Sequence, residues 1–162
     1  MIDYRRKIML IKKAEIQEIQ KKWADGIVKI GSLKGNLDLC KEYTHKFIDQ
    51  LYAFAEGPVL FKPTKAARVQ FRANKEAALS YFIGGNPNYE EDKGFAITPW
   101  KEVRFADDAR MILEEDRALV MGNYFFTDYD NNEVMVEYSF SYKKYSGQLK
   151  IDLHHSSLPF KN

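Results

Sequence analysis

Two long segments in the C-terminal half have the two-residue period of β-strands, and this pattern constrains the fold more than any other feature. Within residues 134–142 every second side chain is Val, Tyr or Phe, and the intervening ones include Glu137 and two serines. Residues 117–127 alternate too, but both of their faces are apolar. One face carries Ala118, Val120 and Tyr124, and the other carries Leu119, Met121 and Phe125. A period of two is typical of β-strands, and a strand apolar on both faces is covered on both.

Shorter apolar runs, separated by turn residues, predict further strands. These lie at residues 59–63, 67–72, 95–97, 102–105 and 110–113, and a last strand begins at Gln148. The long strand over 117–127 is followed by a turn at 128–132, and the strand over 134–142 by a turn at 144–147. From Gly94 onward we therefore expect an antiparallel meander.

The N-terminal half follows helical spacing instead. Its apolar side chains recur every three or four residues, which is typical of one face of a helix. The first stripe consists of Ile16, Ile19, Trp23, Ile27 and Ile30, and the second of Cys40, Tyr43, Phe47, Leu51 and Phe54. A third, short helix is predicted over residues 74–82, with Asn74 as its cap and Gly84 just after its end.

Helices followed by a meander predict the α+β class, with N-terminal helices packed on one face of a curved antiparallel sheet. We expect one domain over residues 13–162, and residues 1–12 are either a tail or a helix extension. The helices can cover only one sheet face, whereas the strand over 117–127 is apolar on both. We therefore predict a homodimer formed through the outer sheet face.

Composition excludes several classes of function. The 162 residues carry a net charge of only +2, which argues against a nucleic-acid partner bound through phosphate contacts. Cys40 is the single cysteine, so neither an intramolecular disulfide nor a cysteine-based zinc site can form. No run approaches the roughly 20 apolar residues that a membrane span needs. We expect a soluble, cytoplasmic protein with no membrane partner.

The C-terminal segment His154-His155-Ser156-Ser157-Leu158-Pro159 places polar groups at the end of an apolar strand. If the alternation that starts at Leu149 continues unbroken, His155 and Ser157 lie on the apolar face. On the residue types alone, a loose strand end without functional meaning is an equal alternative. Three histidines are present, but two adjacent ones on a strand face opposite sides, so a three-histidine metal site is not expected. A serine nucleophile at Ser157 has no orienting acid and is not favoured.

What remains is a pocket at the end of the sheet, lined by hydroxyls, an imidazole and aromatic rings. We predict that it holds a small polar molecule or a positioned water. Its polar lining is expected to be Thr64, Tyr81, Tyr124, Tyr138, His155 and Ser157.

Several motifs resemble those of one family. They are Gly57-Pro58-Val59-Leu60-Phe61-Lys62-Pro63-Thr64-Lys65-Ala66, Ala78-Leu79-Ser80-Tyr81-Phe82, Asp92-Lys93-Gly94-Phe95-Ala96-Ile97, Val120-Met121-Gly122-Asn123-Tyr124-Phe125-Phe126 and the His-His-Ser-Ser-Leu-Pro segment. Over residues 14–159 the chain resembles the iota-class carbonic anhydrases. Their cone-shaped, cystatin-like fold is that of nuclear transport factor 2 and the calcium/calmodulin-dependent kinase II association domain.

This resemblance implies reversible hydration of carbon dioxide to bicarbonate. Members of the family are described as working without a metal, and others with manganese. We therefore expect no cofactor here, with manganese or zinc as alternatives. The resemblance assigns catalytic roles to Thr64, Tyr81, His155 and Ser157. We further predict that Tyr124, Tyr138, His154 and Ser156 lie in the substrate pocket.

Without a metal, hydroxide has to arise by other means. Our hypothesis from the sequence is that Thr64, Tyr81 and Ser157 hold a water and the substrate oxygens, while His155 orients a hydroxyl or shuttles the proton. Two other functions remain open on the same fold. One is a non-catalytic module that binds a small ligand, and the other is an oligomerisation module.

Overall fold

A computed structural model of the chain describes residues 8–98 and 100–162. In this part of the chain the helices are α1 (Lys13–Ser32), α2 (Leu37–Leu51) and α3 (Lys75–Ile83). The strands are β1 (Leu60–Lys62), β2 (Trp100–Phe105), β3 (Arg110–Leu113), β4 (Arg117–Asp128), β5 (Glu133–Tyr145) and β6 (Gln148–Ser157). Two short 3-10 helices span Ala53–Ala55 and Pro87–Tyr89.

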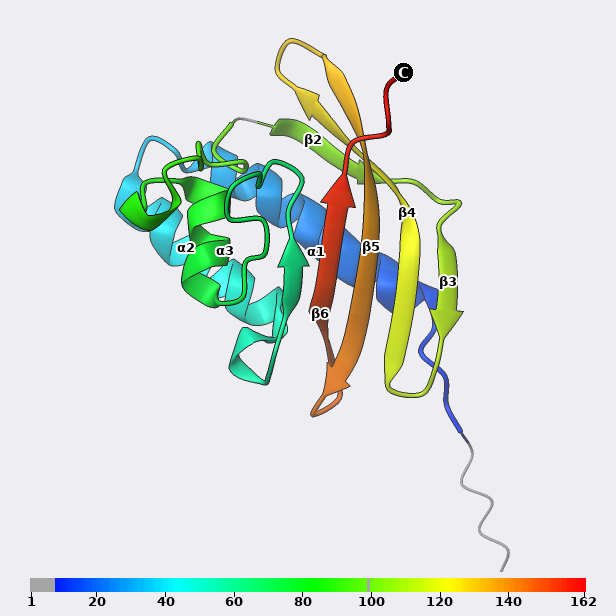
Figure 1. The fold of residues 1–162 in the computed structure, drawn as a ribbon. Coiled ribbons are helices and arrows are strands. Elements are labelled where there is room, and N and C mark those ends of the chain that lie inside the picture. The colour runs from blue at the N-terminus through cyan, green and yellow to red at the C-terminus, as the bar shows by residue number, and fades with distance from the viewer. Residues whose placement is uncertain (1–7, 99) are drawn as a thin grey trace, which may run out of the picture.

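The strands form one curved sheet in the order β1-β6-β5-β4-β2, and β3 also pairs with β4 (Figure 1). The meander from β4 to β6 is antiparallel, as predicted. The expectation of an entirely antiparallel sheet is wrong at one edge, because β1 pairs with β6 in parallel. Parallel neighbours need a long crossover connection, and most of the chain lies between these two strands. The sheet is therefore mixed, and the predicted α+β class is confirmed.

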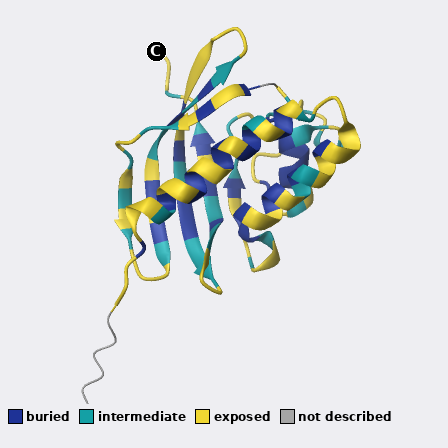
Figure 2. Ribbon diagram, turned by 180° about the vertical axis from the view of Figure 1, so that it is seen from behind, coloured by how far each residue is buried: buried dark blue, intermediate teal, exposed yellow. Residues whose placement is uncertain are grey.

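Helix α1 runs across one face of the sheet, which we call the inner face, and its buried and exposed residues alternate along the ribbon (Figure 2). Its apolar stripe is buried throughout, from Ile16 to Ile30, as the three- and four-residue spacing predicts. Trp23 in the middle of this stripe packs against aromatic rings of β4 and β5, including Tyr124 and Phe140. The protein core therefore lies between α1 and the inner sheet face.

Helices α2 and α3 close the side of the sheet next to β1 (Figure 1). Asparagines cap both: Asn36 accepts from the backbone N–H of Leu39, and Asn74 accepts from that of Ala77. Helix α3 ends at Gly84, whose φ of 69° suits a residue without a Cβ atom. These helices bring Tyr52 and Tyr81 to the β1–β6 edge of the core.

Two of the predicted short strands are absent from the described structure. In the segment 67–72, backbone N–H groups of residues 67–69 donate to the carboxylate of Glu91 instead of to another strand. In the segment 95–97, Phe95 and Ala96 donate to the last carbonyls of α3. These donors are satisfied without pairing in a sheet, so the short apolar runs were a misleading signal there.

The alternatives for the first twelve residues are only partly tested, because residues 1–7 lie outside the described structure, as does Pro99. Helix α1 begins at Lys13, and residues 8–12 are not helical. Within them, Ile11 is buried and its N–H donates to Glu114 O at 2.8 Å, so this segment lies against the turn before β4. None of the helices in the described ranges has the length and apolar character to cross a bilayer.

Candidate active site

Strand β6 contains an irregularity that decides which side chains enter the core. On β5, the neighbours Ser141 and Tyr142 pair with Leu153 and Ile151 of β6, so Asp152 has no partner of its own. One extra residue on a strand is a β-bulge, and it shifts the alternation of all following side chains by one position. The carboxylate of Asp152 is bound by the guanidinium of Arg117 on β4, at 2.8 and 2.9 Å.

The predicted facing of the two histidines and two serines is therefore wrong. His154 and Ser156 are each only 3% exposed and point into the core, whereas His155 is exposed. Ser157 also lies on the outer face, where its hydroxyl donates to Glu137 at 2.9 Å. The count from Leu149 assumed an unbroken strand, and the bulge before His154 reversed it. The structure does not bring His155 or Ser157 together with Thr64 and Tyr81.

A cluster of hydroxyls forms on the inner side instead. Thr64 follows β1, Tyr81 belongs to α3, Tyr124 to β4 and Ser156 to β6. The oxygens of Thr64 and Ser156 are 2.8 Å apart and share a hydrogen bond. The backbone N–H of Lys65 donates to the Tyr81 oxygen at 3.4 Å. Thr64 is half-buried and the other three are buried, so Thr64 is the member nearest to solvent.

Both tyrosine hydroxyls of this cluster are strong candidates for hydrogen-bond donors. Burial raises the pKa of Tyr81 well above its usual value, although contacts with Lys65 and Thr64 offset part of that shift. Burial raises the pKa of Tyr124 in the same way, although hydrogen bonds with Ser156 and Thr64 offset part of that shift. Desolvation disfavours the phenolate, so both side chains keep their protons at neutral pH.

His154 lies beside this cluster, between two tyrosines. Its Nδ1 is 2.9 Å from the Tyr52 hydroxyl, and its Nε2 is 3.1 Å from the Tyr124 hydroxyl. The ring is stacked between Phe61 and Phe140, with centroid distances of 5.0 and 4.1 Å. Burial lowers the pKa of His154 to about 3, and the neighbouring His155 adds to that shift. The imidazole is therefore neutral at physiological pH.

Tyr138 is on the inner face, as expected, but its hydroxyl is directed away from the hydroxyl cluster. It accepts from the amide of Gln20 on α1 at 3.3 Å and lies against Gly122. Burial raises the pKa of Tyr138 to about 12. Its ring packs on that of Tyr124 at a centroid distance of 5.1 Å. Tyr138 therefore supports the wall of the site and contributes no polar group to it.

Almost the whole chain is similar to one known family. Residues 14–158 match the model of a family described as metal-independent carbonic anhydrase. The chain belongs to this metal-independent carbonic anhydrase family. A Nostoc sp. strain PCC 7120 protein named metal-independent carbonic anhydrase is 36% identical over 155 residues, which cover 93% of this chain and 75% of that protein.

Solved structures agree with this family assignment. An iota-carbonic anhydrase from a cyanobacterium, crystallised with bicarbonate, superposes with a TM-score of 0.89 and 33% identity, over 94% of this chain and 95% of that one. A Shewanella oneidensis protein of the nuclear transport factor 2-like kind superposes with a TM-score of 0.55 at 12% identity, over 91% and 99% of the two chains. The second likeness concerns the fold alone, and it confirms the predicted cone-shaped architecture.

Family membership also confirms the prediction that this carbonic anhydrase needs no metal cofactor. Among residues 8–98 and 100–162, the structure has no group of three or more His, Cys, Asp or Glu side chains arranged to hold a metal ion. The hydroxyl cluster offers neutral oxygens and the adjacent His154 one imidazole, a poor ligand set for zinc, which prefers thiolate, imidazole and carboxylate ligands.

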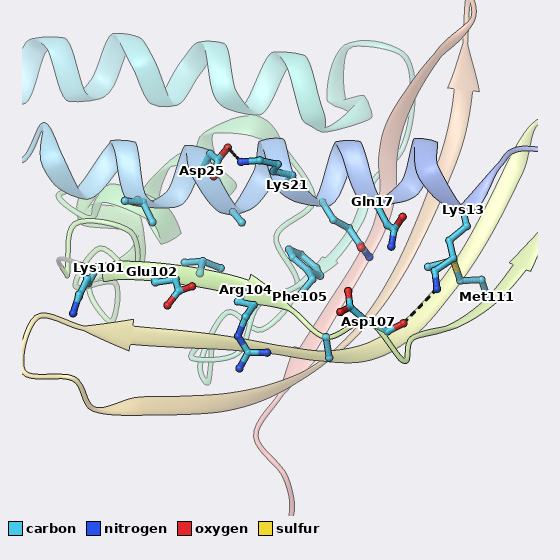
Figure 3. Close-up of a pocket in the computed structure, with 15 residues that line it drawn as sticks. Lys13, Gln17, Lys21, Asp25, Lys101, Glu102, Arg104, Phe105, Asp107 and Met111 are labelled. Atoms are coloured by element: carbon cyan, nitrogen blue, oxygen red, sulfur yellow. Dashed lines mark hydrogen bonds and ion pairs between the residues drawn. The ribbon is translucent and has the colours of Figure 1, made fainter.

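A separate groove of about 450 Å³ lies between α1 and β2 in this carbonic anhydrase (Figure 3). Charged side chains line it, and Lys21 and Asp25 of α1 form an ion pair at 2.6 Å within it. The side chains that line this groove include none of the eight residues predicted for the site. The groove lies at the opposite edge of the sheet from β1 and the Thr64–Ser156 pair.

Two residues of the site were not predicted from the sequence. Tyr52 directly follows α2, and Trp23 lies within the apolar stripe of α1, where its side chain was predicted only as core. The indole N–H of Trp23 donates to the Tyr52 hydroxyl at 2.9 Å. No local pattern distinguishes them from packing aromatics. The available signal was chemical: buried Trp and Tyr carry polar atoms that need partners.

Proposed function

We propose that this chain hydrates carbon dioxide reversibly to bicarbonate at the cluster of Thr64, Tyr81, Tyr124 and Ser156. The observation that carries the proposal is the 2.8 Å pair of Thr64 and Ser156 hydroxyls, enclosed by two tyrosines that stay protonated. The likeness to a protein crystallised with bicarbonate supports this choice of substrate. In this proposal, His154 and Ser156 take the places in the site that the sequence analysis gave to His155 and Ser157.

The reaction joins water and carbon dioxide to form bicarbonate and releases one proton. A metal lowers the pKa of bound water to about 7, and an enzyme without one needs another source of rate. Two other effects can lower the activation free energy: positioning of the reactants and stabilisation of the developing negative charge. Tyr81 and Tyr124 stabilise this charge, because each donates a hydrogen bond to an oxygen of carbon dioxide as that oxygen gains charge.

The Thr64–Ser156 pair positions the attacking water. The Ser156 oxygen accepts a hydrogen bond from the water and receives its proton as the new C–O bond forms. Ser156 passes its own proton to Thr64, and Thr64, the half-buried member, releases its own proton to solvent. Each hydroxyl gains one proton and loses one, so the pair ends neutral and the released proton goes to solvent.

The sequence analysis gave a proton-shuttle role to His155. In this proposal the buried histidine is His154, and it shuttles no proton. Because burial lowers its pKa to about 3, it does not take up a proton at neutral pH. Its contact with Tyr124 at 3.1 Å holds a donor of the site in place. Stacked rings of Phe61 and Phe140 exclude water from this side. The apolar wall suits carbon dioxide, which is uncharged.

Variants of two neighbouring serines on opposite faces of the sheet test the proposal. Ser156→Ala should lower kcat for hydration by about 10²-fold, in the range for loss of one positioned polar group. Ser157→Ala is the matched control and should leave kcat within about twofold. Stopped-flow hydration is measured on protein purified with chelator, with Thr64→Val and Tyr81→Phe as further variants that should be slow.

Other outcomes would redirect the interpretation. A larger loss in Ser157→Ala than in Ser156→Ala would contradict the inner-face site. Activity that appears only when zinc or manganese is added would keep the reaction and overturn the metal-free mechanism. If the wild type is inactive in chelator, with added zinc and with added manganese, a non-catalytic binding module on the same fold is favoured.

We also propose that the chain forms a homodimer through the outer sheet face, as its doubly apolar strand predicts. The outer side of β4 exposes Leu119 at 43% and Met121 at 62%, and Ile112 of β3, which pairs with Leu119, is 60% exposed. Adjacent exposed apolar side chains of this kind mark interaction surfaces. Location in the cytoplasm remains a prediction.

A further inference from the structure

Four buried side chains form a continuous row of hydrogen bonds through the core. The indole nitrogen of Trp23 is 2.9 Å from the Tyr52 hydroxyl, which is 2.9 Å from His154 Nδ1. His154 Nε2 is in turn 3.1 Å from the Tyr124 hydroxyl. All four residues are at most 3% exposed, so water does not compete for these groups. We call this row the Trp23–Tyr124 chain.

The first member of the chain sets its direction. An indole N–H can only donate, so the Tyr52 oxygen accepts from Trp23. The proton of Tyr52 then needs an acceptor of its own, because a buried hydroxyl proton without one is strongly unfavourable. His154 Nδ1 lies at hydrogen-bonding distance and can accept it only if it carries no proton. A neutral imidazole bears a single N–H, so that proton sits on Nε2.

The tautomer of His154 in turn determines the direction of the Tyr124 hydroxyl. With the proton on Nε2, the imidazole donates to the Tyr124 oxygen, and the proton of Tyr124 is directed toward Ser156 and Thr64. With the proton on Nδ1, Tyr124 would donate to Nε2 instead. The hydroxyl cluster would then lose one of its donors.

We propose that Trp23 and Tyr52 are positioning residues that hold His154 in the Nε2–H tautomer and thereby direct the Tyr124 hydroxyl proton at the substrate. This inference rests on the proposed function for its catalytic consequence, although the tautomer itself does not. Hydrogen bonds in a row polarise one another, so the chain strengthens Tyr124 as a donor to an oxygen that gains negative charge.

The surroundings of His154 favour a neutral ring, which the argument requires. Side chains from four elements face it: Trp23 of α1, Phe61 of β1, Tyr124 of β4 and Phe140 of β5, together with Tyr52 after α2. Tyr52 and Tyr124 are the titratable groups among these five, and burial raises the pKa of both. The adjacent His155 points to the opposite sheet face. A protonated ring would donate from both nitrogens and disrupt the bond from Tyr52.

Nitrogen NMR tests the tautomer directly on the wild-type protein. Long-range ¹H–¹⁵N correlation spectra at neutral pH distinguish protonated from bare ring nitrogens. The chain has only three histidines, so variants of His45 and His155 assign the signals. We expect His154 to show a protonated Nε2 and a bare Nδ1. A protonated Nδ1, or averaging between the two forms, would overturn the proposal whatever the activity.

A pair of tyrosine variants tests the positioning role. Tyr52→Phe removes the donor to Nδ1, so we expect a shift toward the Nδ1–H tautomer and a fall in kcat of about tenfold, with KM little changed. Tyr142→Phe removes another buried hydroxyl of the inner face and should change neither the tautomer nor kcat. An unchanged tautomer and kcat in Tyr52→Phe would contradict the role of Tyr52.

The two proposals fail in different ways. If the wild type shows the expected tautomer but hydrates no carbon dioxide, the proposed function fails and the hydrogen-bond direction stands. If it is active with the other tautomer, the function stands and this inference fails. Should Tyr52→Phe not fold, as judged by circular dichroism, the wild-type spectrum still decides the tautomer.

Discussion

Two adjacent histidines on β6 illustrate how strongly one residue position affects chemistry. His154 is buried among aromatic rings and bonded through both nitrogens, whereas His155 is exposed on the other face. Desolvation disfavours the charged imidazolium at the first position, so the pKa of His154 falls to about 3. A buried neutral histidine links folding stability to pH, because the unfolded chain exposes the same ring to water.

His154 should make the protein less stable in mild acid. Above pH about 6.5 the ring is neutral in both states and contributes no pH dependence. Below that value His154 is protonated in the unfolded chain, whereas in the folded protein it stays neutral until the pH falls to about 3. The free energy of unfolding should therefore fall by about 1.4 kcal/mol per pH unit in this window.

Urea unfolding between pH about 7 and about 5 measures this slope, where most carboxylates have not yet titrated. In His154→Gln this contribution to the slope should disappear, whereas the matched variant His155→Gln should keep it. Equal slopes in the wild type and in His154→Gln would show that His154 is not held neutral by burial.

At the scale of elements, the loop between β1 and α3 is held by a buried ion-pair network. The guanidinium of Arg72 is fully buried and bonds both carboxylate oxygens of Asp92, at 2.6 and 2.7 Å. Asp92 also accepts from Ser80 of α3. The carboxylate of Glu91 accepts three backbone N–H groups of the loop. Because Thr64 and Lys65 begin this loop, the network fixes their position relative to Tyr81.

Breaking this network should be costly for stability. Asp92→Asn removes the two short bonds to the buried Arg72 guanidinium and leaves only Glu91, at 3.4 Å, as its charged partner, so we expect the free energy of unfolding to fall by about 3–5 kcal/mol. The exposed pair of Arg104 and Glu133 is the matched control, with side chains 50% and 47% exposed and a distance of 3.6 Å. Arg104→Gln should cost at most about 1 kcal/mol in the same unfolding experiment.

The catalytic assay adds a second readout for the same pair of variants. Displacement of the loop moves Thr64 away from Ser156, so Asp92→Asn should also lower kcat where it remains folded. A stability of Asp92→Asn within about 1 kcal/mol of the wild type would contradict a structural role for this network.

At the scale of the whole molecule, the two faces of the sheet have different partners. The inner face is covered by α1 (Figure 2) and carries the aromatic core. The outer face carries exposed apolar side chains of β4 and β5, together with His155 and the bonded pair of Ser157 and Glu137. Contact with a second copy would bury the apolar part of this face.

Sedimentation equilibrium tests the proposed homodimer. The wild type should sediment at twice the mass of the chain, and Met121→Lys should weaken this association by at least about tenfold, because it places a charge in the apolar patch. Leu37→Lys on α2 is the control, since Leu37 is 75% exposed and lies away from the sheet. A monomeric wild type, or equal association in both variants, would rule out the outer face as the interface.

Much of the architecture could be predicted because it depends on local periodicity. Ile16 to Ile30 follow a helical period, and Val134 to Tyr142 follow a strand period, so α1 and β5 were recognisable. Segments 67–72 and 95–97 were not, because backbone N–H groups of residues 67–69 donate to Glu91 and those of Phe95 and Ala96 to the end of α3. Such partners lie too far away along the chain for a local pattern to indicate them.

Periodicity and motifs were enough to predict the class of fold, the family, and the polar residues available to a site. Which of these residues meet depends on how the strands pair. A single bulged residue, Asp152, turns His154 and Ser156 inward and His155 and Ser157 outward, and its carboxylate is bound by Arg117 from another strand. A strand's alternation is a local property, but a bulge depends on pairing with a neighbour, so the orientation of the site could be read only from the folded sheet.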